Sequence, residues 1–496
     1  MKRSSSTPKP TNTWNASTPK PRGGGIASFA GSPPPSPQTS GFRLPPSAGG
    51  PPPATPPEPS ETGFISYLEA YGNREVTFQF RGLEFRFVLS QGLFSSADID
   101  RGTRLLLKAF SQLLDEDLTQ GRPLPRRILD CGCGVGVIGI CAARALLTTA
   151  GTDSLRLRAQ DRDELARIFT RGNALRNGLG FIEARAEPLL AGEETWDLIL
   201  SNLPAKAGEP VLDDFVSRST ELLAPGGRAV VVVVNTLAGF VRTRLTRRLG
   251  ERGVRLVREG TGHQVVVYER PAVQAADPPA RPPCYPRHRA RYEMEGITYE
   301  IGAVHGAAEF DRPGPAMELA AALLNRLGGG PLGDLSTPVL VHEGGQGHFP
   351  LWFLLFLEQN RAAPPELLLL HGRNILALEA ARSNIAAAPL AAQPLVLTVP
   401  GVDLGLDRGT LARAPPARGF GFIAAFPQIV PQTDPYAGIW EALDSLLTPG
   451  GAALLSLPAT QASRLASRLD KQKPPGFTRL GDLKRRGFRA LLLKRC

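Results

Sequence analysis

From Arg127 onward, short apolar runs alternate with longer stretches in which apolar residues recur at helical spacing. The short runs have the length of buried strands. Strands that alternate with helices are typical of a parallel sheet covered by helices on both faces, so this region predicts an α/β fold. The segments are, in chain order, "RILD", "GVIGICAARALL", "LRLRAQD", "ELARIFTRGNALRNG", "WDLILSN", "FVSRSTELL" and "RAVVVVV".

Two elements are predicted before this alternating region. Residues 74–89, "REVTFQFRGLEFRFVL", alternate between apolar and polar side chains as a pair of strands would. Residues 100–114, "DRGTRLLLKAFSQLL", have helical spacing, and Asp100 stands where a helix N-cap is expected.

Composition divides the 496 residues into four parts. Residues 1–62 are rich in Pro, Ser, Thr and Gly, so they cannot bury enough apolar surface to fold, and we predict a disordered basic tail. A second proline-rich stretch at 271–288 suits a linker. We therefore expect two globular domains, at 63–270 and 289–496.

The formal charge of +11 favours an anionic partner such as nucleic acid, although a basic protein without such a partner has the same composition. Five unevenly spaced cysteines predict a reducing, cytoplasmic location and no metal, because no second ligand pair stands at zinc-finger spacing. No segment approaches the roughly 20 apolar residues of a membrane helix. We expect a monomer with no membrane contact.

The segment "ILDCGCGVGVIG" at 128–139 combines a strand, a carboxylate, closely spaced glycines and a helix. Such a turn lets the backbone approach a ligand closely, and the spacing alone would also admit a dinucleotide. Asp130 ends the strand, where it is a poor neighbour for a pyrophosphate but a good one for an amino group. Asp161 follows the next strand, where a ribose hydroxyl needs an acceptor.

This combination resembles the cofactor site of class I S-adenosylmethionine-dependent methyltransferases. The resemblance implies S-adenosyl-L-methionine as the cofactor, with Asp130 near its methionine amino group and Asp161 at its ribose. It also implies that the adenine lies near Ala186 and Glu187. The glycines expected to line the cofactor are Gly132, Gly134 and Gly136.

The sequence "SNLPAKAG" at 201–208 follows a buried-looking strand. The side-chain carbonyl of Asn202 and main-chain carbonyls near Leu203 and Pro204 can accept both N–H groups of an exocyclic amine. Holding both N–H groups turns the nitrogen lone pair toward the methyl donor. The stretch resembles the [D/N/S]-P-P-[Y/F] motif of amino-methyltransferases, so we take Asn202 and Pro204 as the catalytic candidates.

Ala205 departs from that motif, because an aromatic ring at this position normally stacks on the acceptor base. Phe94 is the ring that we expect to substitute for it. Lys206 is either a contact for a substrate phosphate or a solvated lysine.

Residues 92–107, "GLFSSADIDRGTRLLL", resemble a segment of the RsmC/RlmG-type ribosomal RNA guanine-N2 methyltransferases. The resemblance implies that this segment closes over the cofactor pocket and that Phe94 and Ser95 contact the substrate. A helix start without any ligand contact is the alternative. Tandem active and inactive domains also occur in that group, with the inactive domain first.

The second half of the chain repeats the spacing of the first. "VLVHEGGQGHFP" at 339–350 matches the glycine segment, but Asp130 becomes Val341, Asp161 becomes Gly372 and Asn202 becomes Phe426. We therefore expect two tandem Rossmann-like class I methyltransferase domains, each a mostly parallel seven-stranded sheet. The second domain is expected to have lost catalysis.

Together these features predict an S-adenosylmethionine-dependent methyltransferase that modifies guanine N2 in ribosomal RNA. One alternative is a protein glutamine N5-methyltransferase, which holds its amide substrate with a similar Asn-Pro-Pro motif. The other is a non-catalytic RNA-binding or ribosome-assembly factor, motivated by Ala205. The basic charge and residues 92–107 favour RNA.

Overall fold

The computed structural model describes residues 60–94, 96–151, 154–270, 285–328, 332, 337–414, 419–431, 438–472 and 476–496. Most of the expected tail at 1–62 and of the expected linker at 271–288 lies outside these residues, as does Ser95. Residues 61 and 62 belong to α1 (Glu61–Tyr71) and residues 286–288 to β10 (Pro286–Met294), so ordered structure extends slightly beyond the expected boundaries. Residues 41–496 belong to one compact unit. Below, the first half means the described residues up to 270 and the second half those from 285 onward.

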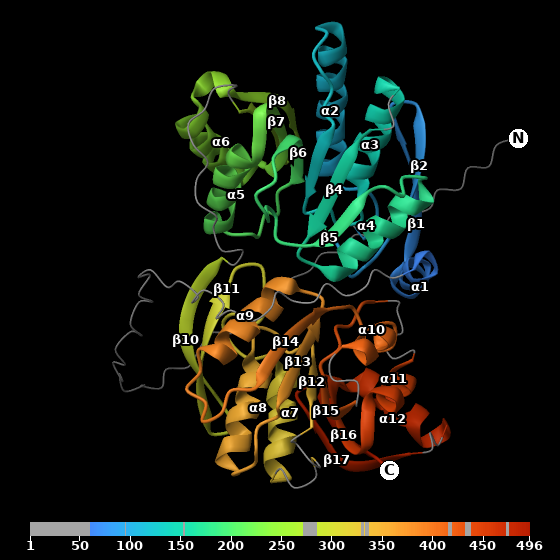
Figure 1. Ribbon diagram of the computed structural model, residues 1–496, viewed down its shortest axis with the longest axis vertical. Helices are drawn as coiled ribbons and strands as arrows, with labels where there is room; N and C mark the ends of the chain where they lie inside the picture. The colour runs from blue at the N-terminus through green and yellow to red at the C-terminus, as the bar shows by residue number, and fades with distance from the viewer. Residues whose placement is uncertain are drawn as a thin grey trace, which may run out of the picture. The chain divides into compact units, whose positions relative to one another are not determined.

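The first half contains a seven-stranded sheet in the order β5-β4-β3-β6-β7-β9-β8 (Figure 1). The pairs from β5 to β7 are parallel, and β9 is antiparallel to both of its neighbours. The strands are β3 (Arg127–Cys131), β4 (Arg156–Asp161), β5 (Glu183–Ala186), β6 (Trp196–Asn202), β7 (Leu223–Val234), β8 (Val254–Gly260) and β9 (His263–Glu269).

Helices cover both faces of this sheet. Successive residues of a strand therefore pack in different apolar clusters. Ile128 packs in a cluster with α2, α3 and α4, whereas Leu129 packs in a cluster with α5 and α6. The helices are α2 (Arg101–Thr119), α3 (Val137–Ala150), α4 (Glu164–Arg176), α5 (Glu209–Leu222) and α6 (Asn235–Leu249), with a short 3-10 turn, η1 (Glu251–Gly253), before β8.

A helix and a hairpin precede the sheet: α1 (Glu61–Tyr71), β1 (Arg74–Phe80) and β2 (Leu83–Leu89). The strands pair in antiparallel register, which confirms the pairing predicted for residues 74–89. The predicted helix begins at Arg101, and the Asp100 carboxylate accepts a hydrogen bond from the Thr103 N–H at 3.1 Å. Asp100 is therefore the N-cap, as its position in the sequence indicated.

The second half repeats this architecture with a sheet in the order β14-β13-β12-β15-β16-β18-β17. A hairpin of β10 (Pro286–Met294) and β11 (Ile297–Val304) precedes it, as β1 and β2 precede the first sheet. The two sheets confirm the predicted tandem α/β fold. The strands are β12 (Val339–His342), β13 (Leu367–Gly372), β14 (Leu395–Pro400), β15 (Phe420–Ala425), β16 (Leu447–Pro458), β17 (Phe477–Arg485) and β18 (Phe488–Arg495).

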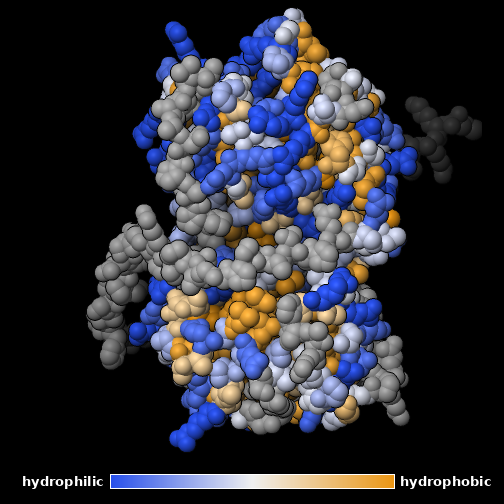
Figure 2. All heavy atoms as spheres, viewed as in Figure 1, coloured by the Kyte–Doolittle hydropathy of each residue, from blue (hydrophilic) through white to orange (hydrophobic). Residues whose placement is uncertain are grey.

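Helices again lie on both faces of the second sheet, since Leu340 and Val341 enter different clusters. On the face shown in Figure 2, the first half is mainly hydrophilic, and hydrophobic side chains gather on the second half around α9. The helices are α7 (Pro315–Arg326), α8 (His348–Gln359), α9 (Ile375–Ala386), α10 (Arg408–Arg413), α11 (Ile439–Leu446) and α12 (Ala459–Gln472).

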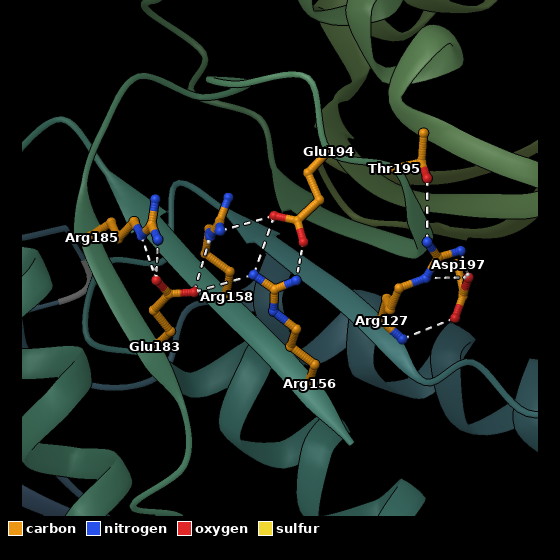
Figure 3. A network of polar contacts seen from close by, with 8 residues as sticks. All are labelled: Arg127, Arg156, Arg158, Glu183, Arg185, Glu194, Thr195 and Asp197. Carbon is orange, nitrogen blue, oxygen red and sulfur yellow. Dashed lines mark hydrogen bonds and ion pairs between the residues drawn. The ribbon is translucent and has the colours of Figure 1, made fainter. Parts of the chain in front are cut away.

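Charged residues line the edge of the first sheet at which its strands begin, and these charges pair with one another (Figure 3). Arg156 and Arg158 share Glu183 and Glu194. Asp197 accepts hydrogen bonds from the side chain of Arg127 and from the Arg126 and Arg127 N–H groups, at 2.7 to 3.1 Å. This network holds the strands together at the edge opposite the carboxyl ends of β3, β4 and β6.

Replacing Asp197 with alanine is expected to lower the free energy of unfolding by roughly 1–2 kcal/mol at neutral pH, because two backbone N–H groups and Arg127 lose their acceptor. Burial alone would raise the pKa of Asp197, but these hydrogen bonds lower it below its ordinary value. The contribution is therefore present above the unfolded-state pKa and lost on acidification. Urea unfolding at neutral and acidic pH measures it.

Asp213→Ala is the matched control for that experiment, since Asp213 pairs with Arg244 at the surface. We expect it to change stability by less than about 0.5 kcal/mol. An Asp197→Ala variant as stable as the wild type at neutral pH would contradict the role assigned to the network.

Candidate active site

A cavity of about 640 Å³ opens at the carboxyl ends of β3, β4 and β6. This edge is where an open, mostly parallel sheet binds its ligands. The cavity brings together residues from distant parts of the sequence: Phe94, Asp100, Gly132, Gly134, Asp161, Asn202, Leu203, Pro204, Ala205 and Lys206.

The glycine turn has a backbone that other residues would adopt only under strain. The φ angles of Gly132, Gly134 and Gly136 are 72°, 56° and 88°. A Cβ added at Gly134 would have no atom within 4 Å, and both Gly132 and Gly134 line the cavity. A ligand can therefore lie directly against the main chain here.

Asp161 ends β4 with its carboxylate on the cavity wall. It accepts hydrogen bonds from the N–H of Gly134 at 3.2 Å and from the N–H of Asp163 at 3.1 Å. Burial and the neighbouring Asp163 charge raise the pKa of Asp161 to about 6. This acceptor at the end of β4 suits the ribose hydroxyls of the expected cofactor.

Asp130 lies behind the glycine turn and is fully buried, and it is not part of the cavity wall. Its Oδ2 accepts the Gly139 N–H at 2.8 Å, whereas Oδ1 has no hydrogen-bond partner among the described residues. A Cβ at Gly139 would lie 2.8 Å from that carboxylate. Asp130 thus fixes the first turn of α3 beneath the loop, and its expected contact with the methionine amino group stays a prediction.

Asn202 ends β6, and its amide is oriented by α2. Its Nδ2 donates to both Asp100 carboxylate oxygens at 3.3 and 3.4 Å and to Thr103 Oγ1 at 3.3 Å. A carboxylate only accepts hydrogen bonds, so the amide nitrogen must face it and Oδ1 is left as the acceptor. Gly102 gives the Asp100 carboxylate room, because a Cβ there would lie 3.0 Å from its Oδ1.

The residues after Asn202 form a tight turn in which the Pro204 carbonyl accepts the Ala207 N–H at 3.1 Å. One lone pair of that carbonyl is thereby used within the turn. Leu203 is buried in the cavity wall, whereas Ala205 and Lys206 are exposed at it. The structure thus brings the catalytic candidates together at one place.

Phe94 lines the cavity with 74% of its surface exposed. A ring this exposed is free to cover a planar ligand, so its position agrees with the role expected of it. The second expected substrate residue on this segment, Ser95, lies outside the described residues.

Glu187 does not line the cavity, although its N–H donates to the Asp161 carbonyl at 2.8 Å. Its side chain instead pairs with Arg185 at 3.3 Å. The next residues, Pro188 and Leu189, do line the cavity, so the structure gives the expected adenine region apolar walls.

Sequence reasoning missed several wall residues because they lie far from the motifs. His263 begins β9, and Val211 lies in the first turns of α5. The second half also contributes to the wall, through Tyr285, His305, Gly306 and Leu376. No local pattern marks any of these residues as ligand-facing.

The equivalent edge of the second half is filled by its own side chains. Glu309 occupies the space beside Gly345, and the Phe349 and Phe426 rings lie 4.7 Å apart. His342 and His371 are buried, with their Nδ1 atoms 2.8 Å apart. These histidines contact one another within the core, and among the described residues no group of three His, Cys, Asp or Glu side chains is arranged to hold a metal ion.

No helix within the described ranges is long and apolar enough to cross a membrane.

Comparison with known proteins agrees with this geometry. Residues 84–266 match the methyltransferase small domain family. Over 160 residues the chain is 29% identical to the uncharacterized protein YbxB of Bacillus subtilis, covering 32% of this chain and 72% of YbxB. Over 144 residues it is 29% identical to ribosomal RNA small subunit methyltransferase C of Actinobacillus pleuropneumoniae, covering 28% of this chain and 40% of that protein.

The described fold also resembles a solved structure from T. thermophilus, the 16S rRNA N2 G1207 methyltransferase (RsmC) in complex with AdoMet and guanosine. The TM-score is 0.54 at 18% identity, and the match covers 86% of this chain and 100% of that one. At this identity the likeness concerns the fold, which includes both halves. The structural likeness confirms the expected fold of both halves, and the match at residues 84–266 agrees with the expected methyltransferase domain, whose cofactor is expected to be S-adenosyl-L-methionine.

Binding of S-adenosyl-L-methionine is expected to weaken about tenfold between pH 7.5 and pH 5. We expect the ribose hydroxyls to donate to the ionised form of Asp161, whose raised pKa of about 6 means that most of this carboxyl is protonated at pH 5. Calorimetric titration across this range measures the change. An Asp161→Asn variant should bind weakly with a flat pH profile, and a flat profile in the wild type would contradict the assignment.

Proposed function

We propose that this chain, which carries a methyltransferase small domain at residues 84–266, transfers a methyl group from S-adenosylmethionine to the N2 amine of a guanine in ribosomal RNA. The observation that carries the proposal is the orientation of Asn202, whose amide nitrogen is held by Asp100 and whose carbonyl oxygen is left at the cavity. Such an acceptor suits an exocyclic amine rather than a hydroxyl or a thiol.

The residues of the cavity divide the work of methyl transfer between them. Asp161 and the glycine turn hold the cofactor, which supplies a methyl group bound to an electrophilic sulfonium sulfur. Asn202 Oδ1 accepts one N–H of the amine and directs the nitrogen lone pair toward that methyl group. The rigid turn at Pro204 fixes the second acceptor, and the proton released by the methylated nitrogen can pass to water at the mouth of the cavity.

Three observations support RNA as the acceptor. The chain carries a formal charge of +11, which favours a polyanion. Residues 92–107 resemble the corresponding segment of ribosomal RNA guanine-N2 methyltransferases, and Phe94 of that segment is exposed at the cavity. One relative is named ribosomal RNA small subunit methyltransferase C.

The second half is proposed to be non-catalytic. Val341 stands where the first half has Asp130, and Glu309 and Phe426 take up space at the edge where the first half binds its ligands. The whole chain would then hold one cofactor.

Nucleoside mass spectrometry of ribosomal RNA from cells with and without the gene tests the substrate. We expect N2-methylguanosine to fall by one modified site per ribosome when the gene is deleted. An unchanged nucleoside profile, together with a methylated protein glutamine, would replace the proposal with the protein substrate. An unchanged profile without any methylated product would favour a non-catalytic RNA-binding protein.

A further inference from the structure

The cavity is completed by the second half of the chain, at the end of the hairpin formed by β10 and β11. Tyr285 precedes β10, and His305 and Gly306 follow β11. The His305 N–H donates to the Tyr285 carbonyl at 2.8 Å, which ties the two ends of the hairpin together. All three residues line the cavity opened by Asn202 and the glycine turn.

His305 lies directly against the turn that carries the substrate motif. A Cβ added at Gly208 would come within 2.9 Å of its Nδ1 and 3.0 Å of its Cε1. The ring is therefore packed beside the segment in which Ala205 replaces the usual aromatic residue. Burial, followed by the charges of Arg287 and His288, lowers the pKa of His305, so the ring is neutral at physiological pH.

Gly306, which follows β11, lies on the side of the cavity that is expected to hold the cofactor. A Cβ at Gly306 would lie 2.8 Å from Nη1 of Arg162, the residue after Asp161. Tyr285 packs against the first-half cluster that includes α5, and burial and the Asp214 carboxylate raise its pKa. The end of the β10–β11 hairpin thus lies against both the turn that follows Asn202 and the residues that follow Asp161.

A reciprocal contact between equivalent segments fixes this arrangement. The Glu164 N–H donates to the Arg373 carbonyl at 2.9 Å, and the Ile375 N–H donates to the Arg162 carbonyl at 3.0 Å. Residues 161–173 and 372–384 correspond in the repeat, so each half offers the same backbone position to the other. The Arg373 side chain also pairs with Asp163 at 2.7 Å.

The exposed face of β10 carries a row of arginines that begins at the cavity. Arg287, Arg289 and Arg291 are exposed and alternate with half-buried residues along the strand. Arg289 and Arg291 project from one face about 6.6 Å apart. Arg287 lies at a bulge beside Pro286, and its guanidinium group stacks on the Phe310 ring, 3.5 Å from the ring centroid. Arg289 and Arg291 share Glu300 of β11, at 3.6 and 3.7 Å. Glu293 follows them toward the tip of the hairpin, so the positive charge is concentrated on the cavity side.

We propose that the β10–β11 hairpin is the arm that guides an RNA strand into the methyl-transfer cavity, with His305, in addition to Phe94, as a ring for the acceptor base and Arg287, Arg289 and Arg291 as phosphate contacts. A neutral imidazole offers a flat face for stacking, and three exposed guanidinium groups on one short strand suit a polyanion. The inference rests on the proposed function. It gives the second half a role in substrate binding.

Direct RNA binding by the full chain tests the arm separately from catalysis. Fluorescence anisotropy with a ribosomal RNA fragment, at several salt concentrations, compares the wild type with a variant that carries R287A, R289A and R291A together. We expect weaker binding and a fall of about 2 in the slope of log affinity against log salt, as loss of three phosphate contacts to a single strand implies. Arg485→Ala, on exposed strand β17, is the matched control and should leave the slope unchanged.

His305 is tested by KM and kcat for RNA together with the affinity for S-adenosylmethionine. His305→Ala should raise the KM for RNA roughly 5- to 150-fold, as loss of one stacked base implies, with the cofactor affinity unchanged. His305→Phe should recover most of the loss. Unchanged RNA binding and salt slope in the triple arginine variant, with unchanged KM in His305→Ala, would overturn the proposal that the hairpin guides RNA into the cavity. Wild-type protein that binds RNA through the arm but methylates none would overturn the proposed function instead.

Discussion

Replacing Asn202 with alanine is expected to lower kcat for methyl transfer by roughly 10²- to 10³-fold. The variant removes the Asn202 side-chain carbonyl, which is proposed to accept an N–H of the amine, and the loss of a preorganised hydrogen-bonding group in a transition state has this order of effect. The affinity for S-adenosylmethionine should stay within about twofold. Single-turnover kinetics on RNA, with calorimetry for the cofactor, separates the two quantities.

A second variant tests whether Asp100 orients Asn202. Asp100→Asn retains a good helix cap and one side-chain acceptor, so it should lower kcat by only about tenfold and leave α2 intact. Asn325→Ala, an exposed asparagine of α7, is the matched control and should change neither quantity. Full activity in Asn202→Ala would remove the amine-acceptor role from this motif.

Replacing Asp161 with alanine is expected to weaken S-adenosylmethionine binding by about 100-fold. Asp161 is a half-buried acid on the cavity wall, and hydrogen bonds to a charged group contribute roughly 1.5–3 kcal/mol. Its loss also frees the Gly134 N–H and loosens the glycine turn. Calorimetry at pH 7.5 measures the change, and circular dichroism checks that the fold is retained.

Glu187→Ala is the sharpest comparison for Asp161→Ala. Family resemblance placed Glu187 at the adenine, but the structure pairs it with Arg185 away from the cavity wall. We therefore expect its loss to change cofactor affinity by less than about threefold. A large effect in Glu187→Ala and none in Asp161→Ala would reverse the assignment of the cofactor's ribose and adenine ends.

Local patterns predicted those parts of the site that local backbone geometry determines. Asp100 could be recognised as a helix cap because its partner is the N–H three residues later. The glycine turn could be recognised because only glycine adopts its positive φ angles without strain. The alternation of strands and helices predicted the first sheet for the same reason, since periodicity is a property of neighbouring residues, and the repeated motif spacing extended that prediction to the second sheet.

The parts that sequence could not predict depend on long-range packing. The resemblance puts Asp130 at the cofactor and that contact stays a prediction, but no local pattern predicts the hydrogen bond that its carboxylate accepts from the Gly139 N–H beneath the loop. The partnership of Asn202 with Asp100 joins residues 102 positions apart. His305 reaches the cavity from the other half of the chain, so no motif around it points to a ligand.

Transfer of an isotopically labelled methyl group from S-adenosylmethionine to RNA by the purified full chain tests whether this protein methylates a guanine amine with the help of Asn202. After digestion, we expect the label in N2-methylguanosine with the wild type, and an initial rate of labelling roughly 10²- to 10³-fold lower with Asn202→Ala. Asp213 is a surface carboxylate that pairs with Arg244, and the Asp213→Ala variant should retain wild-type labelling. Label found only in a protein glutamine, or equal label with the wild type and Asn202→Ala, would contradict the account.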